Sequence, residues 1–223
     1  MTVLLILATF VIFLTIDYFY GRRRAAQPAV AIGREPVARP RLLPTIVAGF
    51  ELPENLRYHP GHTWALAESP RLMRVGFDDF AARLIGKMDR ISLPQRGRWI
   101  RQGQTLLTVY RDGSKAEIVS PMEGIVADVN EHVLRDPALA LRDPYGDGWL
   151  VTVESPDAKT NFRNLLGGAV ARKWMEEAAA CLFERMPALA GAVAQDGGVA
   201  VSDLTSHLPD QNWTEWTREF FLT

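Results

Sequence analysis

The sequence predicts a mainly β domain with helical additions, preceded by a transmembrane helix. Three observations predict this architecture. An apolar run occupies residues 3–20, short runs with strand composition and Gly-rich turns fill residues 51–154, and apolar residues recur at the helical period from residue 160 onward. The corresponding segments are a membrane anchor at 1–24, a tether at 25–50, a β domain at 51–158 and a helical extension at 159–223.

The composition excludes several classes of protein. With 48% hydrophobic and 23% charged residues, the chain has enough apolar surface for a core and is not disordered throughout. Its net charge of -1 argues against a nucleic-acid binder, which is normally basic. The single cysteine, Cys181, excludes a disulfide framework and any metal site that needs several cysteines. It lies in the predicted long helix, where we expect it to pack against other apolar side chains.

Residues 2–20 form the predicted anchor, because a helix that rises about 1.5 Å per residue over this length nearly spans a hydrocarbon core of about 30 Å. A cleaved signal peptide is the alternative, and it would carry positive charge before the apolar run. Here no charge precedes the run, whereas Arg22, Arg23 and Arg24 follow it. Arginines stay on the cytoplasmic side, so we expect a single-pass protein of the inner, or cytoplasmic, membrane whose soluble domain faces the cytoplasm. The lipid bilayer is one expected partner.

Residues 21–45 are rich in proline and contain six arginines against one glutamate. Proline-rich composition favours an extended, semi-rigid chain over a packed element. The positive charge could lie along an anionic membrane surface, and a solvated linker explains the same composition equally well.

Seven short runs of strand composition fill the β domain, and strands this short and frequent indicate a sandwich or a barrel. One helix is predicted among them, over residues 80–86, because Asp78 and Asp79 are good helix N-caps and Gly86 is a common helix stop. The predicted strands are Thr63–Ala67, Met73–Phe77, Arg90–Leu93, Thr105–Tyr110, Ala116–Val119, Gly124–Val129 and Leu150–Val153.

The helical extension begins with a predicted amphipathic helix of about 25 residues that ends at Pro187, with Gly167 and Gly168 as a weak point near its start. A turn at 196–198, a strand-like run at 199–201 and a final helix at 209–221 follow. The apolar stripe of the long helix consists of Phe162, Leu166, Val170, Trp174, Ala178, Leu182 and Met186.

On the final helix, Trp213, Trp216 and Phe220 recur at i, i+3 and i+7, so their rings share one side. In one interpretation this side packs onto the β domain or onto the helix around Trp174, because a buried aromatic face is common. In the other it binds a partner subunit, because tryptophan is enriched among the residues that dominate binding energy.

Three stretches of the β domain resemble the H protein of the glycine cleavage system, a relative of lipoyl and biotinyl carrier domains. The resemblance covers residues 57–156 and implies a lipoyl-domain-like, flattened β-barrel of two stacked sheets, the barrel-sandwich hybrid. It does not extend to residues 1–50 or 160–223, which we expect to be additions. The motifs that carry it are Tyr58–Trp64 with Val75–Gly86 and Ile91–Pro94, Ser120–Val126 with Val129–Glu131, and Asp136–Leu139 with Asp143–Val151.

The sequence departs from the family at the residue that carries the cofactor. The resemblance implies lipoate on a lysine at a hairpin tip, seven positions before the serine of the Ser-Pro pair; counting back from Ser120 gives Gly113. Asp112-Gly113 is a strong type I′ turn signal, so we expect the hairpin without its functional residue. Lys115 precedes an alanine, as the family's lysine does, but lies two residues too late. A carrier domain without lipoate is the favoured interpretation, and lipoate on Lys115 is the alternative.

Other candidate sites are weak. His59 and His62 have no third histidine or carboxylate beside them in the sequence, so no metal site is predicted. Ser202, Asp203 and His207 have the residue types of a catalytic triad without the sequence context of a nucleophile elbow. Since no catalytic set is found, the chain is not expected to be an enzyme.

These observations together predict a membrane-anchored, non-catalytic domain that serves as an accessory or scaffolding subunit of a larger respiratory, photosynthetic or transport complex. The expected partners are the other subunits of that complex. The alternative is a lipoyl carrier protein of a glycine cleavage-type system that uses Lys115. The two differ in whether the chain carries a cofactor.

Overall fold

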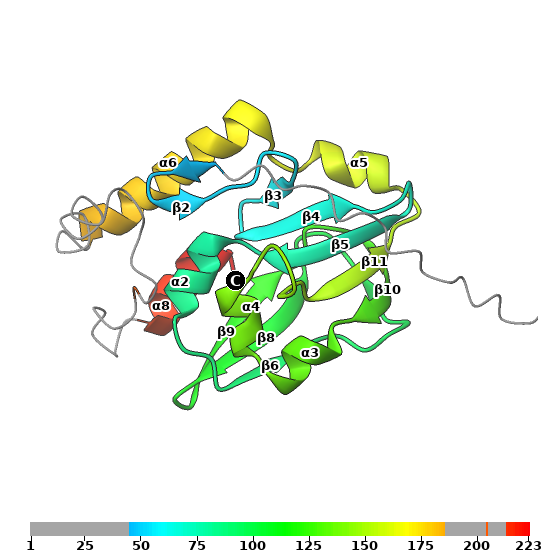
Figure 1. Ribbon diagram of the computed structural model, residues 1–223, viewed down its shortest axis with the longest axis horizontal. Coiled ribbons are helices and arrows are strands. Elements are labelled where there is room, and N and C mark those ends of the chain that lie inside the picture. The colour runs from blue at the N-terminus through cyan, green and yellow to red at the C-terminus, as the bar shows by residue number, and fades with distance from the viewer. Residues whose placement is uncertain (1–44, 186–203, 205–212) are drawn as a thin grey trace, which may run out of the picture. The chain divides into compact units, whose positions relative to one another are not determined.

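The structure is a computed structural model that describes residues 45–185, 204 and 213–223, all within one compact unit that spans residues 42–223 (Figure 1). The predicted anchor, nearly all of the tether and the strand-like run at 199–201 lie outside the described residues. Among the helices of the described ranges, none combines the length and the apolar character that a membrane crossing requires.

Two antiparallel sheets make up most of the domain. The larger has the strand order β3-β4-β5-β11-β10-β7, and the smaller has the order β6-β8-β9 (Figure 1). Their strands are β3 (Arg57–His59), β4 (Thr63–Ala67), β5 (Leu72–Phe77), β6 (Arg90–Ser92), β7 (Trp99–Ile100), β8 (Thr105–Arg111), β9 (Ser114–Val119), β10 (Gly124–Val129) and β11 (Val151–Glu154). All seven predicted strands are confirmed, each within two residues of its predicted bounds, which is the usual uncertainty of strand ends.

The core takes buried side chains from both sheets and joins them in one hydrophobic cluster. On β8 and β9, for example, Leu107, Val109 and Ile118 are at most 1% exposed. Trp64 of β4 is fully buried, and its indole N–H donates to the carbonyl of Phe77 at 2.9 Å. Its ring lies against Gly76 of β5, where any side chain would overlap it, so glycine is needed at this position.

Helix α2 (Asp79–Ile85) confirms the single helix predicted within the β domain. Asp78 caps it, because its Oδ1 accepts a hydrogen bond from the amide of Ala81 at 2.8 Å. Gly86 ends it with a φ of 65°, which is in the left-handed region that favours glycine. Two short helices, α3 (Glu131–Arg135) and α4 (Ala138–Arg142), were not predicted.

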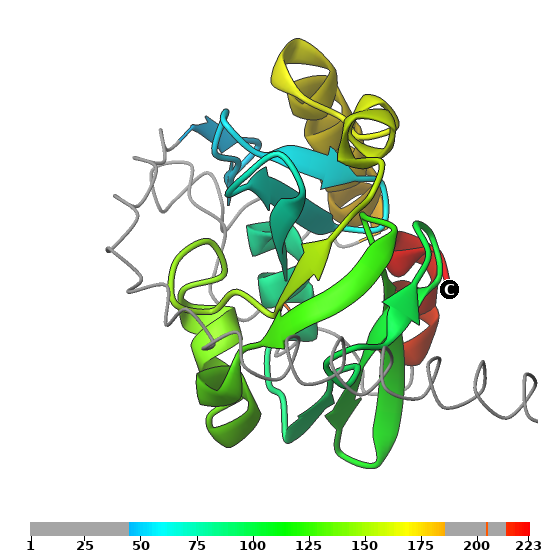
Figure 2. The ribbon, with the colours of Figure 1, turned by 90° about the vertical axis from the view of Figure 1, so that its right-hand side faces the viewer.

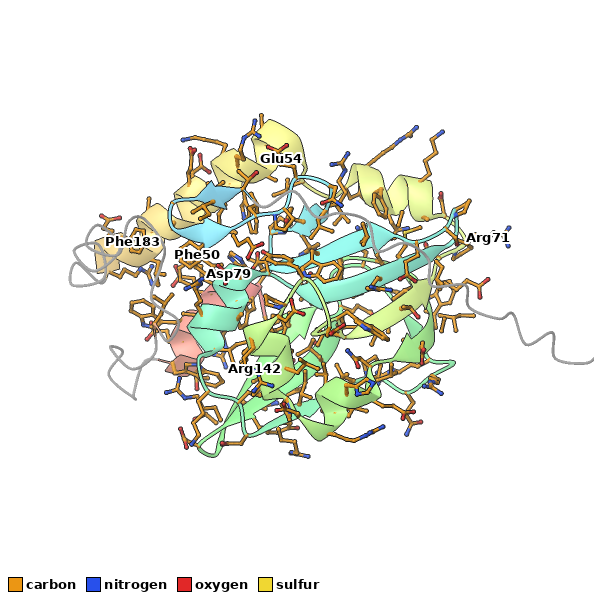
Figure 3. The ribbon with its side chains drawn as sticks, viewed as in Figure 1. Phe50, Glu54, Arg71, Asp79, Arg142 and Phe183 are labelled. Carbon is orange, nitrogen blue, oxygen red and sulfur yellow. The ribbon has the colours of Figure 1, made fainter. Side chains whose placement is uncertain are left out.

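A small hairpin precedes the family-like region. Strands β1 (Ile46–Val47) and β2 (Phe50–Glu51) pair antiparallel, and Phe50 is fully buried. The Phe50 ring lies 4.9 Å from the ring of Phe80 on α2 and 6.4 Å from that of Phe183 (Figure 3). The hairpin is therefore packed onto the domain and does not belong to an extended tether.

The prediction of one 25-residue helix is wrong. The structure contains α5 (Ala158–Arg163) and α6 (Gly168–Arg185), separated near the glycines marked as a weak point. The physical reason is that Leu166 pairs with Tyr58 through two backbone hydrogen bonds, of 2.9 and 2.7 Å, and so cannot be helical. Gly168 then starts α6 with a φ of 56°.

The predicted stripe of the long helix is confirmed only in part. Leu182 is fully buried, and Phe162, Leu166, Trp174 and Ala178 are half-buried against the core, whereas Met186 lies outside the described residues. Val170 is 62% exposed, whereas the fully buried positions of α6 lie one residue further along on most turns. The buried residues of α6 are Ala171, Met175, Ala179 and Leu182.

Candidate functional site

The candidate site is the β8–β9 hairpin, where the family carries its lysine. Arg111 and Ser114 are paired across the two strands, which leaves Asp112 and Gly113 as a two-residue turn. Their φ values are 46° and 81°, and two successive positive values define the predicted type I′ turn. Nothing lies within 4 Å of the position that a Cβ atom on Gly113 would take. The hairpin tip is thus kept and open, but it carries no amine.

Lys115 lies one residue beyond the turn, on β9, opposite Tyr110. Its side chain is 65% exposed, and its Nζ lies 3.1 Å from Oε1 of Glu117. The hydroxyl of Thr105 donates to the other carboxylate oxygen at 3.2 Å. The hydrogen bond from Lys115, followed by that from Thr105, holds the pKa of Glu117 below its usual value. The ammonium group is therefore accessible but directed along the strand toward Glu117.

The last helix, α8 (Trp213–Phe221), lies alongside β9 and also contacts α2 (Figure 2). Lys115 and Glu117 line one side of a small cleft, and Thr214 and Arg218 of α8 line the other. No local sequence pattern predicts that these two segments are neighbours, because they are far apart in the chain.

The structure also shows where the aromatic side of the last helix lies. Trp213, Trp216 and Phe220 are only 4%, 7% and 7% exposed, and the Phe220 ring lies 5.1 Å from that of Phe80. The structure agrees with the interpretation in which the aromatic side of this helix packs onto the rest of the domain. The assignment of these three side chains to a partner surface is corrected accordingly, because buried rings offer no area to another subunit.

His62 is a core residue. Its Nδ1 lies 2.9 Å from Oδ2 of Asp78, both side chains are at most 1% exposed, and its ring stacks on Phe80 at 4.1 Å. Nδ1 of His59 accepts a hydrogen bond from the amide of Gly61, and burial lowers the pKa of His59. Within the described ranges, no group of three side chains is arranged to hold a metal ion.

Of the two remaining candidate sites, the structure describes only one. Cys181 is half-buried and packs against the core, as expected from its position in the helix. Ser202, Asp203 and His207 lie outside the described residues.

Comparison with known proteins connects this hairpin with a family. The family model of the glycine cleavage H-protein matches residues 56–178.

The chain belongs to the glycine cleavage H-protein family.

Curated H proteins agree with this assignment. The glycine cleavage system H protein of Anaeromyxobacter sp. (strain K) is 32% identical over 128 residues, which are 57% of this chain and 98% of the relative. The probable glycine cleavage system H protein of Aeropyrum pernix is 36% identical over 122 residues, 54% of this chain and 84% of the relative. A crystal structure of an H protein from Mycobacterium marinum is similar at 23% identity, with a TM-score of 0.47, over 57% of this chain and 98% of that chain.

The H-protein match is longer than the resemblance in the sequence. It includes α5 and the first part of α6, so the expectation that everything from residue 160 onward is an addition is wrong for residues 160–178. The β1–β2 hairpin and α8 lie outside the match. Gly113, the position to which the resemblance assigns lipoate, does not fit lipoate because it has no side chain; on this hairpin only Lys115 offers an amine.

Proposed function

We propose that this chain is an H-protein-family domain that no longer carries lipoate and acts, held at a membrane, as a non-catalytic accessory or scaffolding subunit of a larger membrane complex. One observation carries the proposal. The attachment position is Gly113, in a type I′ turn, and the lysine nearest to it on the hairpin is bound to Glu117 on the same strand.

The geometry explains why a displaced lysine matters. A lipoyl arm works when a long side chain at an exposed tip sweeps a dithiolane between the active sites of partner enzymes. Lys115 lies on a strand that is paired with β8 on one side and flanked by α8 on the other. An arm attached there would start further from the tip and beside a helix, so both its reach and the access of a ligase would be reduced.

A second function is favoured by the exposure of Lys115. Its side chain is 65% exposed and is followed by Ala116, as the resemblance requires, and the curated relatives are H proteins. On this alternative the chain is a lipoyl carrier of a glycine cleavage-type system, and lipoate on Lys115 supplies the reactive dithiol.

The intact mass of the protein separates the two functions. The chain is produced with a lipoate–protein ligase and lipoate, next to its Lys115→Ala variant, and both are weighed. We expect no lipoyl adduct on either protein. An adduct on the natural chain that is absent from Lys115→Ala would establish the carrier function and contradict the accessory one.

The membrane location is a separate part of the proposal, supported by the apolar run at residues 3–20 and the arginines that follow it. We expect the full chain to stay with membranes through high-salt and carbonate washes, and deletion of residues 1–24 to release it. Release of the full chain by salt alone would show that charge, and not a spanning helix, holds it. A mature N-terminus near Ala26 would show that the run is a cleaved signal peptide.

A further inference from the structure

Helix α8 covers the strand that carries Lys115, although it is no part of the family match. Among the residues that the structure describes, β9 of the three-stranded sheet pairs only with β8, so without α8 its other edge would be open. An open edge strand is a template for binding another chain. α8 lies along this edge, and the hydroxyl of Thr223, just past its end, donates to the carbonyl of Glu117 at 3.4 Å (Figure 2).

Aromatic side chains hold α8 in place. Trp213, at its start, lies near the hairpin tip, with the guanidinium of Arg111 5.8 Å from its ring centroid. At the other end of the helix, Phe220 packs on Phe80 at 5.1 Å, and Phe221 is fully buried. The groove under α8 therefore fits an amphipathic helix with one aromatic face.

Within the described ranges, the ion pair that joins α8 to another helix lies at the surface. Arg185, the last residue of α6, forms a two-pronged ion pair with Glu219, and the two side chains are 43% and 40% exposed. Exposed ion pairs contribute little stability. α8 has no hydrogen-bonded strand pairing with β9 within the described residues, because it is a helix.

Docking of α8 also buries a polar group without a hydrogen-bond partner among the described residues, which is unfavourable in free energy. This group is Nε1 of Trp213. In addition, α8 has nine residues, fewer than the about 12–15 that an isolated helix needs in water. Its helical form thus depends on docking, so undocking and unfolding of α8 are one event.

From these observations we propose that α8 is an intramolecular cap: it occupies a docking groove for a protein partner that presents an aromatic-faced amphipathic helix, and it must undock before that partner reaches the edge of β9. The cleft left between Lys115 and docked α8 is about 150 Å³, below the roughly 300–1,000 Å³ of ligand pockets. The edge of β9 under α8 is consequently closed to another helix while α8 is docked, although the side chain of Lys115 stays 65% exposed. This inference goes beyond the accessory function and holds whether or not Lys115 carries lipoate.

Hydrogen exchange of the full chain tests the cap. Phe220→Ala removes a buried ring, which shifts a docking equilibrium by roughly 100- to 5,000-fold. We expect faster exchange by about that factor in α8 and in β9 together, with β10 and β11 unchanged. Faster exchange throughout the domain would show that α8 is an integral part of the core, and a change confined to α8 would show that it shields nothing. Either result overturns the proposal.

Two further variants guard against misfolding and non-specific effects. Glu219→Ala breaks only the exposed ion pair with Arg185, so it should produce a smaller change in the same two elements. Glu131→Ala, on α3, breaks exposed ion pairs with Arg135 and Arg96 and should leave β9 unchanged. A response of β9 to Glu131→Ala equal to its response to Glu219→Ala would contradict the proposal.

A synthetic peptide of residues 209–223 tests the groove itself. Added to the Phe220→Ala chain, it should restore the protection of β9 in a saturable manner, whereas the same peptide with Trp216→Ala and Phe220→Ala should not. Failure of the natural peptide to bind would overturn the existence of an exchangeable groove. This experiment does not measure lipoylation. Failure of the peptide to bind would therefore not contradict the proposed accessory function.

Discussion

Replacing one residue should restore a carrier lysine to this hairpin. In Gly113→Lys the introduced side chain stands seven positions before Ser120, at the tip of the type I′ turn. If loss of the lysine is the reason why the domain carries no lipoate, this variant should be lipoylated by a lipoate–protein ligase, while the natural chain is not. The structure around Gly113 indicates how much folding stability the substitution removes.

The expected loss of stability comes only from the backbone conformation at residue 113. Gly113 has a φ of 81°, and a side chain in the left-handed region costs about 1–2 kcal/mol. No heavy atom lies within 4 Å of the new Cβ, so no steric cost is added. For a domain of this size about 2–4 °C of melting temperature correspond to 1 kcal/mol, which predicts a fall of about 2–8 °C. The fold should survive, because typical domains are stable by about 5–15 kcal/mol.

Intact mass and thermal melting together provide the assay, with Gly97→Lys as the matched control. Gly97 has a φ of 83° and also has no atom within 4 Å of its Cβ position, so it should lose the same stability without becoming lipoylated. A Gly113→Lys protein that melts in the expected range and stays unmodified would refute the reasoning. It would mean that the surroundings of the tip, and not only the missing lysine, prevent attachment.

Three further substitutions test the packing around the site. Asp78→Ala removes the cap of α2 and the partner of buried His62, and should cost about 2–4 kcal/mol in the free energy of unfolding, measured by urea denaturation. Burial, together with the charge of Asp79, raises the pKa of Glu51. Protonated Glu51 therefore adds stability at low pH, and this stability is lost as the pH rises through the pKa of Glu51. Glu51→Gln should raise the urea midpoint at pH 7 and leave it unchanged below about pH 4. Gly124→Ala, whose Cβ would overlap a backbone carbonyl of β11, should unfold the domain or reduce its soluble yield sharply, whereas an alanine at open Gly103 should not.

The sequence by itself determined those features that depend on a few neighbouring residues. Asp78 and Gly86 define the ends of α2, because a carboxylate satisfies free amides at a helix start and glycine tolerates the left-handed backbone at its end. The Asp112-Gly113 pair likewise predicts its turn, because both positions need a positive φ. The quoted motifs were sufficient to predict the H-protein family, which the family match confirms.

Only the tertiary structure decided how distant segments meet. Leu166 lies in a stretch of helical period, yet it pairs with the backbone of Tyr58, and two strong hydrogen bonds to a strand outweigh a local helical preference. The periodicity of Trp213 and Phe220 predicted a shared face but not its partner, since β9 lies about 100 residues away in the chain and Phe80 lies 140 residues before Phe220. Burial and pairing depend on which surfaces the folded backbone brings within a few ångströms, and no local pattern records that proximity.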